Sequence, residues 1–262
     1  MSTMSQFFAA GGVPIQYNTN TSGSFTTPVS GKYLITAIGG GGGGGGTGAR
    51  GGGAGGLAQS LVSLSSGVVL TLTVGAGGAG GYPGTAGGTT TVSGSGITTL
   101  TANGGAISTG TGGAGGTASG GNIMNVTGGS AGNGDYFGGG AVGVYGTTPA
   151  ASSGQHTGAS VIGAPLVGLY HNSGGFLSGR LLQPSGGLYL WTAEGYGTQT
   201  GIQPGQGAIN QTYNFGPGHA GLFAGGGGAG NAGKFGGGGH TSPQGTAVAG
   251  GVGGVIIEYF LA

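Results

Sequence analysis

The sequence predicts an all-β, partly irregular fold. A small antiparallel β-structure is expected beside packed polyglycine-II helices, which have three residues per turn, with no α-helix of note. Glycine supplies 79 of the 262 residues, about 30% against an average near 7%. Charged residues make up 3% of the chain, which excludes a surface covered with ion pairs. The 10 Tyr, 9 Phe and 1 Trp residues are more than a disordered chain carries. An ordered fold built on glycine is therefore expected.

The polyglycine-II prediction rests on a three-residue repeat. The tracts 75–81 and 112–116 repeat every three residues, a period that belongs neither to an α-helix nor to a β-strand. It is the period of the extended left-handed helix, whose outward-pointing N–H and C=O groups need partners on neighbouring helices. Ordering glycine costs about 0.5–1 kcal/mol per residue more than ordering alanine, so close backbone approach must offset that cost. Mobile loops are the alternative interpretation.

Strands are expected where apolar and polar residues alternate around these tracts. The first two strands, 24–28 and 32–38, are joined by a turn at 29–31. The next two are 57–64 and 68–74, with a Ser66-Gly67 turn before the second. A hairpin of 89–92 and 97–102 around 93–96 follows, and 255–261 is the closing strand. No capped amphipathic stretch indicates a helix of useful length.

Glycine density divides the chain into segments. Glycine makes up 14 of 18 residues over 39–56, 17 of 76 over 141–216 and 15 of 30 over 225–254. The expected segments are an attachment or assembly segment at 1–22, a glycine-rich β/polyglycine domain at 23–140, an aromatic-rich insertion or set of distal loops at 141–216, and a glycine-rich return with the closing strand at 217–262. The first residues lack the basic and long apolar regions of a signal peptide, so export by that route is not expected.

Composition excludes several classes of protein. Collagen needs glycine at every third position over long runs and abundant proline, whereas only 9 prolines are present. The 4 Lys and Arg residues are scattered, so no nucleic-acid partner is expected. The longest apolar run, 161–170, is too short to span a membrane. The absence of cysteine excludes disulfides and thiolate metal sites.

Several glycine-rich and strand-like motifs follow one another in a definite order. They are Gly23–Pro28, Tyr33–Ile38, Gly39–Gly46, Gly51–Gly56, Leu70–Gly78, Gly87–Val92 and Gly253–Tyr259. As an ordered string they resemble the glycine-rich domain of bacteriophage tail-fibre and virion proteins, over Ser24 to Asn103 and Gly225 to Tyr259. The resemblance implies a lattice of polyglycine helices next to a small β-structure, which presents variable loops to a bacterial surface receptor. The Trp-rich N-terminal attachment domain of the long-tail-fibre adhesins has no counterpart in this sequence.

Catalytic motifs occur only as matches that a glycine-rich chain produces by chance. Gly128-Gly-Ser130-Ala-Gly132 has the form of a nucleophile elbow, but no helix is expected after it. Gly228 to Lys234 has the form of a P-loop, but Phe235 stands where Ser or Thr must hold magnesium. Glycoside cleavage by a pair of carboxylates could use only Asp135 with Glu194, and their spacing in the sequence gives no support for such a pair. The four histidines lie too far apart for a helical zinc pair. No enzyme activity, cofactor or metal is expected.

The segment 141–216 carries 8 of the 20 aromatic residues, interleaved with Ser, Thr, Asn and Gln. Tyr and Trp give large, rigid contact area at low entropic cost, and sugars stack on such rings. The candidate receptor-binding residues are Tyr145, Tyr170, His171, Arg180, Tyr189, Trp191, Tyr196 and Tyr213. A second small core is the alternative, because leucines lie among them. In 188–191, strand alternation would place the leucines on one face and the aromatics on the other.

The sequence therefore predicts a phage virion fibre or adhesin, which binds a bacterial outer-surface receptor (protein or polysaccharide) through aromatic-rich loops. The expected partners are other virion fibre or tail proteins and sister subunits, as a trimer by analogy, with no membrane insertion. The expected location is the virion. The alternative is a purely structural virion appendage or coat protein without receptor binding. A secreted eukaryotic glycine-rich protein would need a signal peptide, and an ice-binding bundle would need regular threonines on a flat face.

Overall fold

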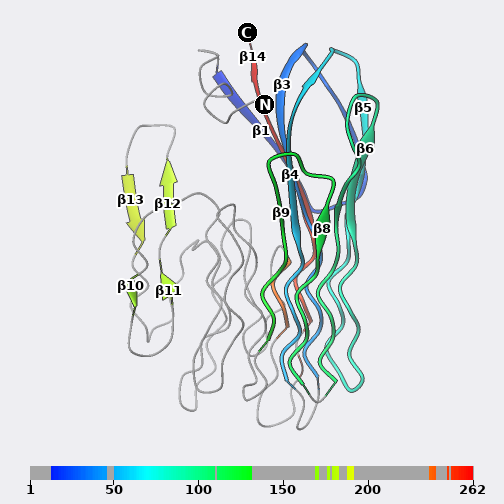
Figure 1. The fold of residues 1–262 in the computed structure, drawn as a ribbon, viewed down its shortest axis with the longest axis vertical. Coiled ribbons are helices and arrows are strands. Elements are labelled where there is room, and N and C mark those ends of the chain that lie inside the picture. Colours follow the sequence, from blue (N-terminus) through cyan, green and yellow to red (C-terminus); the bar gives the residue numbers. More distant parts are fainter. Residues whose placement is uncertain are drawn as a thin grey trace.

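The computed structural model describes residues 13–45, 50–109, 111–131, 236–239, 247 and 249–261, and the backbone of four short strands between 169 and 191. Within these residues the regular structure is β-strand throughout, and no α-helix is present. This confirms the all-β class that composition and alternation predict. The long strands lie at one end of the molecule, and glycine tracts continue from them to the opposite end, where they turn back (Figure 1).

Two five-stranded antiparallel sheets form the strand-bearing end. Sheet A contains, in spatial order, β1 (Val13–Thr19), β14 (Gly254–Leu261), β3 (Gly31–Ile38), β4 (Leu57–Leu64) and β9 (Met124–Val126). Sheet B contains, in spatial order, β2 (Gly23–Thr26), β5 (Val69–Thr73), β6 (Thr90–Gly94), β7 (Leu100–Ala102) and β8 (Ala118–Ser119). Two separate antiparallel pairs are β10 (Leu169–Tyr170) with β11 (Phe176–Leu177), and β12 (Gly179–Leu182) with β13 (Leu188–Trp191).

The predicted strands are all present, with shifts of a few residues at their ends. β2 ends at Thr26, two residues before Pro28, whose ring nitrogen has no hydrogen to donate to a ladder. In the predicted hairpin, β6 continues to Gly94, and the turn includes Gly96 with φ of +83°. The strands β1 and β8 to β12 were not predicted. β1 pairs with β14 along its whole length, so Val13–Thr19 of the expected segment 1–22 lie in sheet A.

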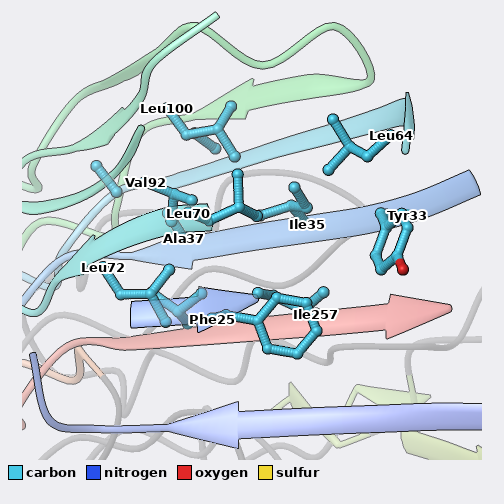
Figure 2. Packing of buried hydrophobic residues seen from close by; sticks show 13 residues of the cluster. Phe25, Tyr33, Ile35, Ala37, Leu64, Leu70, Leu72, Val92, Leu100 and Ile257 are labelled. Atoms are coloured by element: carbon cyan, nitrogen blue, oxygen red, sulfur yellow. The ribbon is translucent and has the colours of Figure 1, made fainter. Parts of the chain in front are cut away.

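The main hydrophobic core lies between the two sheets. Its largest members from sheet B are Phe25, Leu70, Leu72, Val92 and Leu100, and those from sheet A include Tyr33, Ile35, Leu64 and Ile257. These side chains point toward one another from the facing sheets (Figure 2). Fully burying a side chain of this size contributes about 1.5–3 kcal/mol. The alternation of strands β3 and β5 thus accounts for the stacking of the two sheets.

The second face of sheet A is also buried and mostly apolar. Leu34 and Leu61 pack with Ile123 there, and Ile38 and Leu57 pack with Ile256. A buried polar pair interrupts this face, where Gln59 Nε2 donates to Thr36 Oγ1 at 2.9 Å. Sheet A therefore has buried apolar side chains on both of its faces.

The glycine tracts continue the strands and bond to one another through their backbones. In tract 39–45, which extends β3, Gly39, Gly42 and Gly45 donate to tract 50–56, Gly40 and Gly43 donate to 85–88, and Gly41 donates to Gly251, with N···O distances of 2.8–3.1 Å. Each neighbour is thus reached by every third residue. Tract 50–56 repeats this pattern toward 103–106 and 236–239. The described tracts of the domain 23–140 and of the return 217–262 therefore form one hydrogen-bonded body, here called the glycine lattice.

Burial in the glycine lattice follows the same three-residue step. Gly75 and Gly78 are buried, while Ala76 and Ala79, which directly follow them, are exposed. A Cβ built on Gly113 would lie 2.5 Å from the backbone nitrogen of Gly53 and closer still to the Ala106 carbonyl oxygen. Real Cβ atoms essentially never come closer than 3.0 Å to such atoms. Glycine is required at the inward positions because neighbouring backbones occupy the place of a side chain, and in tract 75–79 alanine stands where the tract faces solvent.

Candidate functional site

The predicted receptor-binding residues fall into two groups. Four of them lie in the short strand pairs, namely Tyr170 in β10, Arg180 in β12, and Tyr189 and Trp191 in β13. The other four, Tyr145, His171, Tyr196 and Tyr213, lie outside the described residues.

The β12–β13 pair places two of the predicted aromatics together. Trp191 is opposite Gly179, and Arg180 is opposite Leu190. Since successive strand residues alternate between faces, Tyr189 and Trp191 share one face of the pair, and Arg180 and Leu190 share the other. The alternation expected for 188–191 is thus consistent with this register. In this register Arg180 is placed on the face of Leu190, opposite to the face of Tyr189 and Trp191.

A second candidate surface lies at the end of the glycine lattice farthest from the sheets. The connection 80–84 joins tract 75–79 to tract 85–88 there, and Tyr82 at its centre is 79% exposed. Tyr82 is not among the residues that the sequence predicts as receptor contacts, because it does not lie in a cluster of aromatic residues. The signal that could have found it is a single aromatic followed by proline inside a glycine tract, where a turn is expected.

The same end of the lattice holds Arg50. Gly45 donates to the Arg50 carbonyl oxygen at 3.1 Å and also pairs with Gly81, which precedes Tyr82. The backbone nitrogen of Arg50 donates to Ser108 Oγ at 2.7 Å, and Ser108 is buried. Three tract ends are therefore fixed to one another directly beside the Tyr82 connection.

An aromatic cluster lies at the opposite, strand-bearing end. The Phe25 ring is 5.0 Å from that of Tyr17 and 6.0 Å from that of Tyr259, and Tyr33 stacks on Tyr259 at 5.2 Å. The Tyr33 hydroxyl donates to the Val29 carbonyl at 2.6 Å. Burial raises the pKa of Tyr33 above its ordinary value, outweighing the lowering effect of that hydrogen bond. The Tyr33 hydroxyl is thus a structural donor, which stays protonated throughout the neutral range.

The outer face of sheet B is uncharged, and all but one of its outward side chains carry a hydroxyl group. Its outward positions are Ser24, Thr26, Val69, Thr71, Thr73, Thr91, Ser93, Thr101 and Ser119. Beside them, Thr89 Oγ1 donates to Asn103 Oδ1 at 3.2 Å, and Asn103 Nδ2 donates to Thr117 Oγ1 at 2.9 Å. The side chains named here are small, and they include no carboxylate, imidazole or amine.

The motifs that suggested chemistry have structural surroundings in the described residues. Ser130, the central residue of the elbow-like motif, accepts a hydrogen bond from the Gly115 nitrogen at 3.2 Å. Gly128 before it belongs to the glycine lattice and donates to Gly116 at 2.8 Å. No three His, Asp or Glu residues among those described come together where they could hold a metal ion. The described part of the chain contains no helix able to cross a membrane.

A scan against protein-family models and a search of curated proteins found no match to this sequence.

Proposed function

We propose that the glycine tracts are polyglycine-II helices packed as a lattice. Three observations support this assignment. Backbone donors reach the same neighbour at every third residue. Buried and exposed positions recur at the same interval. Carbonyl oxygens of adjacent tracts occupy the places where Cβ atoms would be. A helix with three residues per turn and no internal hydrogen bonds has this environment when it is surrounded by others of its kind.

We further propose that the protein is a phage virion fibre or adhesin component that binds a bacterial surface receptor. The observation that carries this proposal is the division of the molecule into two ends (Figure 1). Strands β1 and β14 lie at one end, and lattice connections such as 80–84 lie at the other. A rigid body with this polarity can be attached at the strand-bearing end and present loops at the far end. The motif resemblance to phage glycine-rich domains favours the same function.

The attachment is assigned to residues 1–12, which precede β1. Residues 13–19 pair with β14, so deleting 1–22 as a whole would remove an edge strand of sheet A. Deletion of 1–12 alone should leave the thermal unfolding of the isolated protein unchanged and abolish its incorporation into particles. Particles with a normal content of the truncated chain would contradict this assignment.

Receptor contact by the segment 141–216 is assigned first to Tyr189 and Trp191, because they share one face of the β12–β13 pair. Trp and Tyr dominate binding hot spots, where truncation costs about 2 kcal/mol or more. Trp191→Ala should therefore weaken adsorption to host cells by roughly thirtyfold, with normal incorporation into particles. Leu190→Ala, on the opposite face, is the matched control.

The two candidate functions give different results in this experiment. If the protein is an adhesin, particles carrying Trp191→Ala should assemble normally but adsorb poorly to host cells. If the protein is a purely structural appendage, particles that incorporate Trp191→Ala should adsorb normally. Alternatively, if the Trp191 ring belongs to a core, the variant should fail to assemble. Immunogold labelling of the wild-type particle, at a fibre tip or elsewhere, tests the virion location directly.

A further inference from the structure

The connection 80–84 is held in one conformation by hydrogen bonds at its base. The Thr85 nitrogen donates to the Ala79 carbonyl at 3.0 Å, and the Ala79 nitrogen donates to Thr85 Oγ1 at 2.7 Å. The same two ends are tied to tract 39–45, since Gly43 donates to the Thr85 carbonyl at 2.9 Å and Gly81 donates to the Gly44 carbonyl at 3.1 Å. The loop is therefore closed on itself and anchored to the most buried tract of the lattice.

Tyr82 stands at the centre of this loop with 79% of its surface exposed. The only other large hydrophobic residue that is exposed in the described chain is Val69, on sheet B. Tyr82 has glycine or proline on both sides, at Gly80, Gly81, Pro83 and Gly84. A Cβ built on Gly81 would meet nothing nearer than the Pro83 carbonyl oxygen at 3.5 Å. The ring is thus presented on a fixed loop, and the loop residues beside it have no long side chains to form the walls of a pocket.

We propose that Tyr82 is a stacking platform for a sugar ring of a bacterial surface polysaccharide. The proposal rests on the function proposed above and names a ligand class and a second contact point for it. A sugar ring can place its C–H face on one exposed aromatic ring while its hydroxyl groups remain hydrated. A protein hot spot instead needs close contacts around the anchor that exclude water, and the glycines and proline of this loop offer little side-chain surface for such contacts. The glycines beside Tyr82 let a bulky polysaccharide chain approach the ring. Because the loop is already held in one conformation, binding does not have to offset the entropy cost of ordering it.

A single stacked ring gives weak binding, so the site would work through repetition. In a particle that carries many copies of the chain, the second contact forms at the effective concentration set by the first. When every copy loses its ring, each contact becomes weaker, and the avidity of the whole surface therefore falls by more than the affinity of one site. We expect removal of the Tyr82 ring to lower polysaccharide binding by tenfold or more on a multivalent surface.

The test uses the full chain and a microarray of purified bacterial O-polysaccharides and capsular polysaccharides. Tyr82→Ala and Tyr82→Leu remove the ring, and Tyr82→Phe keeps it. Val69→Ala changes the other exposed apolar residue at the strand-bearing end and is the matched control. Thermal unfolding of each variant shows whether the fold is kept; because Tyr82 is exposed, we expect all four to unfold as the wild type does.

The proposal is supported if wild type, Tyr82→Phe and Val69→Ala bind the same polysaccharides and both ringless variants lose that binding. It is overturned if the folded ringless variants bind as the wild type does, or if the wild type binds no polysaccharide on the array. In the second case, adsorption of wild-type particles to cells would keep the adhesin function with a protein receptor. Failure of the wild type both to adsorb and to appear in particles would overturn the proposed function itself.

Discussion

The β-sandwich and the glycine lattice are adjacent parts of one chain that are held together in opposite ways. In the sandwich, Leu70 and Ile35 fill the space between two sheets, whose backbones stand about 10 Å apart in such folds. In the lattice, that space is missing, because carbonyl oxygens lie where side chains would begin. Apolar burial stabilises the first region and direct backbone hydrogen bonds stabilise the second. The same substitution should therefore have different consequences in the two regions.

The change from one region to the other can be followed along a single strand. Leu70 and Leu72 of β5 are buried at a step of two residues, and Gly75 and Gly78 are buried at a step of three. At the junction, the Gly75 nitrogen donates to the buried Thr90 Oγ1 at 3.0 Å. The strand thus becomes a lattice tract without a turn, because the backbone stays extended while the residues that face inward change their spacing.

The largest effect is expected from a branched side chain inside the lattice. Gly113→Val should abolish the folded, soluble protein, because its Cβ would overlap the backbone of Gly53 and the carbonyl of Ala106. Neither neighbour can move without breaking hydrogen bonds of its own, such as the 2.9 Å bond from the Gly53 nitrogen to the Ala106 carbonyl. Soluble yield and thermal unfolding measure the effect.

The matched control for this prediction is the adjacent residue. Ala114 is exposed, so Ala114→Val places the same branched side chain on the solvent side of the tract. It should fold with a thermal midpoint close to that of the wild type. Equal stability of Gly113→Val and Ala114→Val would show that the tracts are not packed against one another, and the lattice interpretation would be wrong.

Much of this contrast could be predicted from the sequence, and the exceptions have physical causes. The alternation in 57–64 predicts β4 to the residue, and the three-residue repeat of 75–81 predicts backbone partners on neighbouring tracts. β1 escaped prediction because Pro14 interrupts a short run, and proline is tolerated there because β1 is an edge strand. β9 has three residues and is defined by its pairing with β4, which no local pattern contains.

The candidate site could be predicted less completely than the fold. Composition selects 141–216 as a whole, but pairing decides which residues share a face, and the opposite faces of Arg180 and Trp191 depend on a register that only the structure supplies. Tyr82 was missed for a related reason. A lone aromatic among glycines gives no cluster in sequence, and its exposure follows from where the lattice tracts turn back.

A cavity in the sandwich should have an intermediate effect. Leu70→Ala removes a fully buried side chain between the sheets, and such substitutions cost about 2–5 kcal/mol. We expect a folded protein with a lower midpoint in chemical denaturation. Val69→Ala, one residue away and 54% exposed, should cost far less. A similar cost at both positions would contradict the assignment of β5 to a core face and a solvent face.

Alkaline pH should weaken the sandwich through Tyr33. Its pKa is raised in the folded protein by burial, so the unfolded chain loses this proton first, near pH 10. The contribution is fully present below that pH and is lost as the pH rises through the folded pKa. Tyr33→Phe should therefore be less stable than wild type by about 0.5–1.5 kcal/mol at pH 7, from loss of the Val29 hydrogen bond. The difference in stability between wild type and Tyr33→Phe should narrow above pH 10. A difference in their denaturation midpoints that stayed constant with pH would contradict this prediction.

The smallest effect is expected at a glycine outside the lattice, and it tests the contrast from the other side. Gly31 begins β3, and a Cβ built there meets no atom within 4 Å. Its φ is not in the left-handed region, so alanine can adopt the same backbone. Gly31→Ala should then be neutral or stabilise the protein by about 0.4–1 kcal/mol, since alanine has less conformational freedom to lose on folding. Gly113→Ala adds the same single methyl group and should destabilise the protein severely. If chemical denaturation gave both variants the same stability, glycine would be serving chain flexibility throughout, and close backbone packing would not explain its abundance.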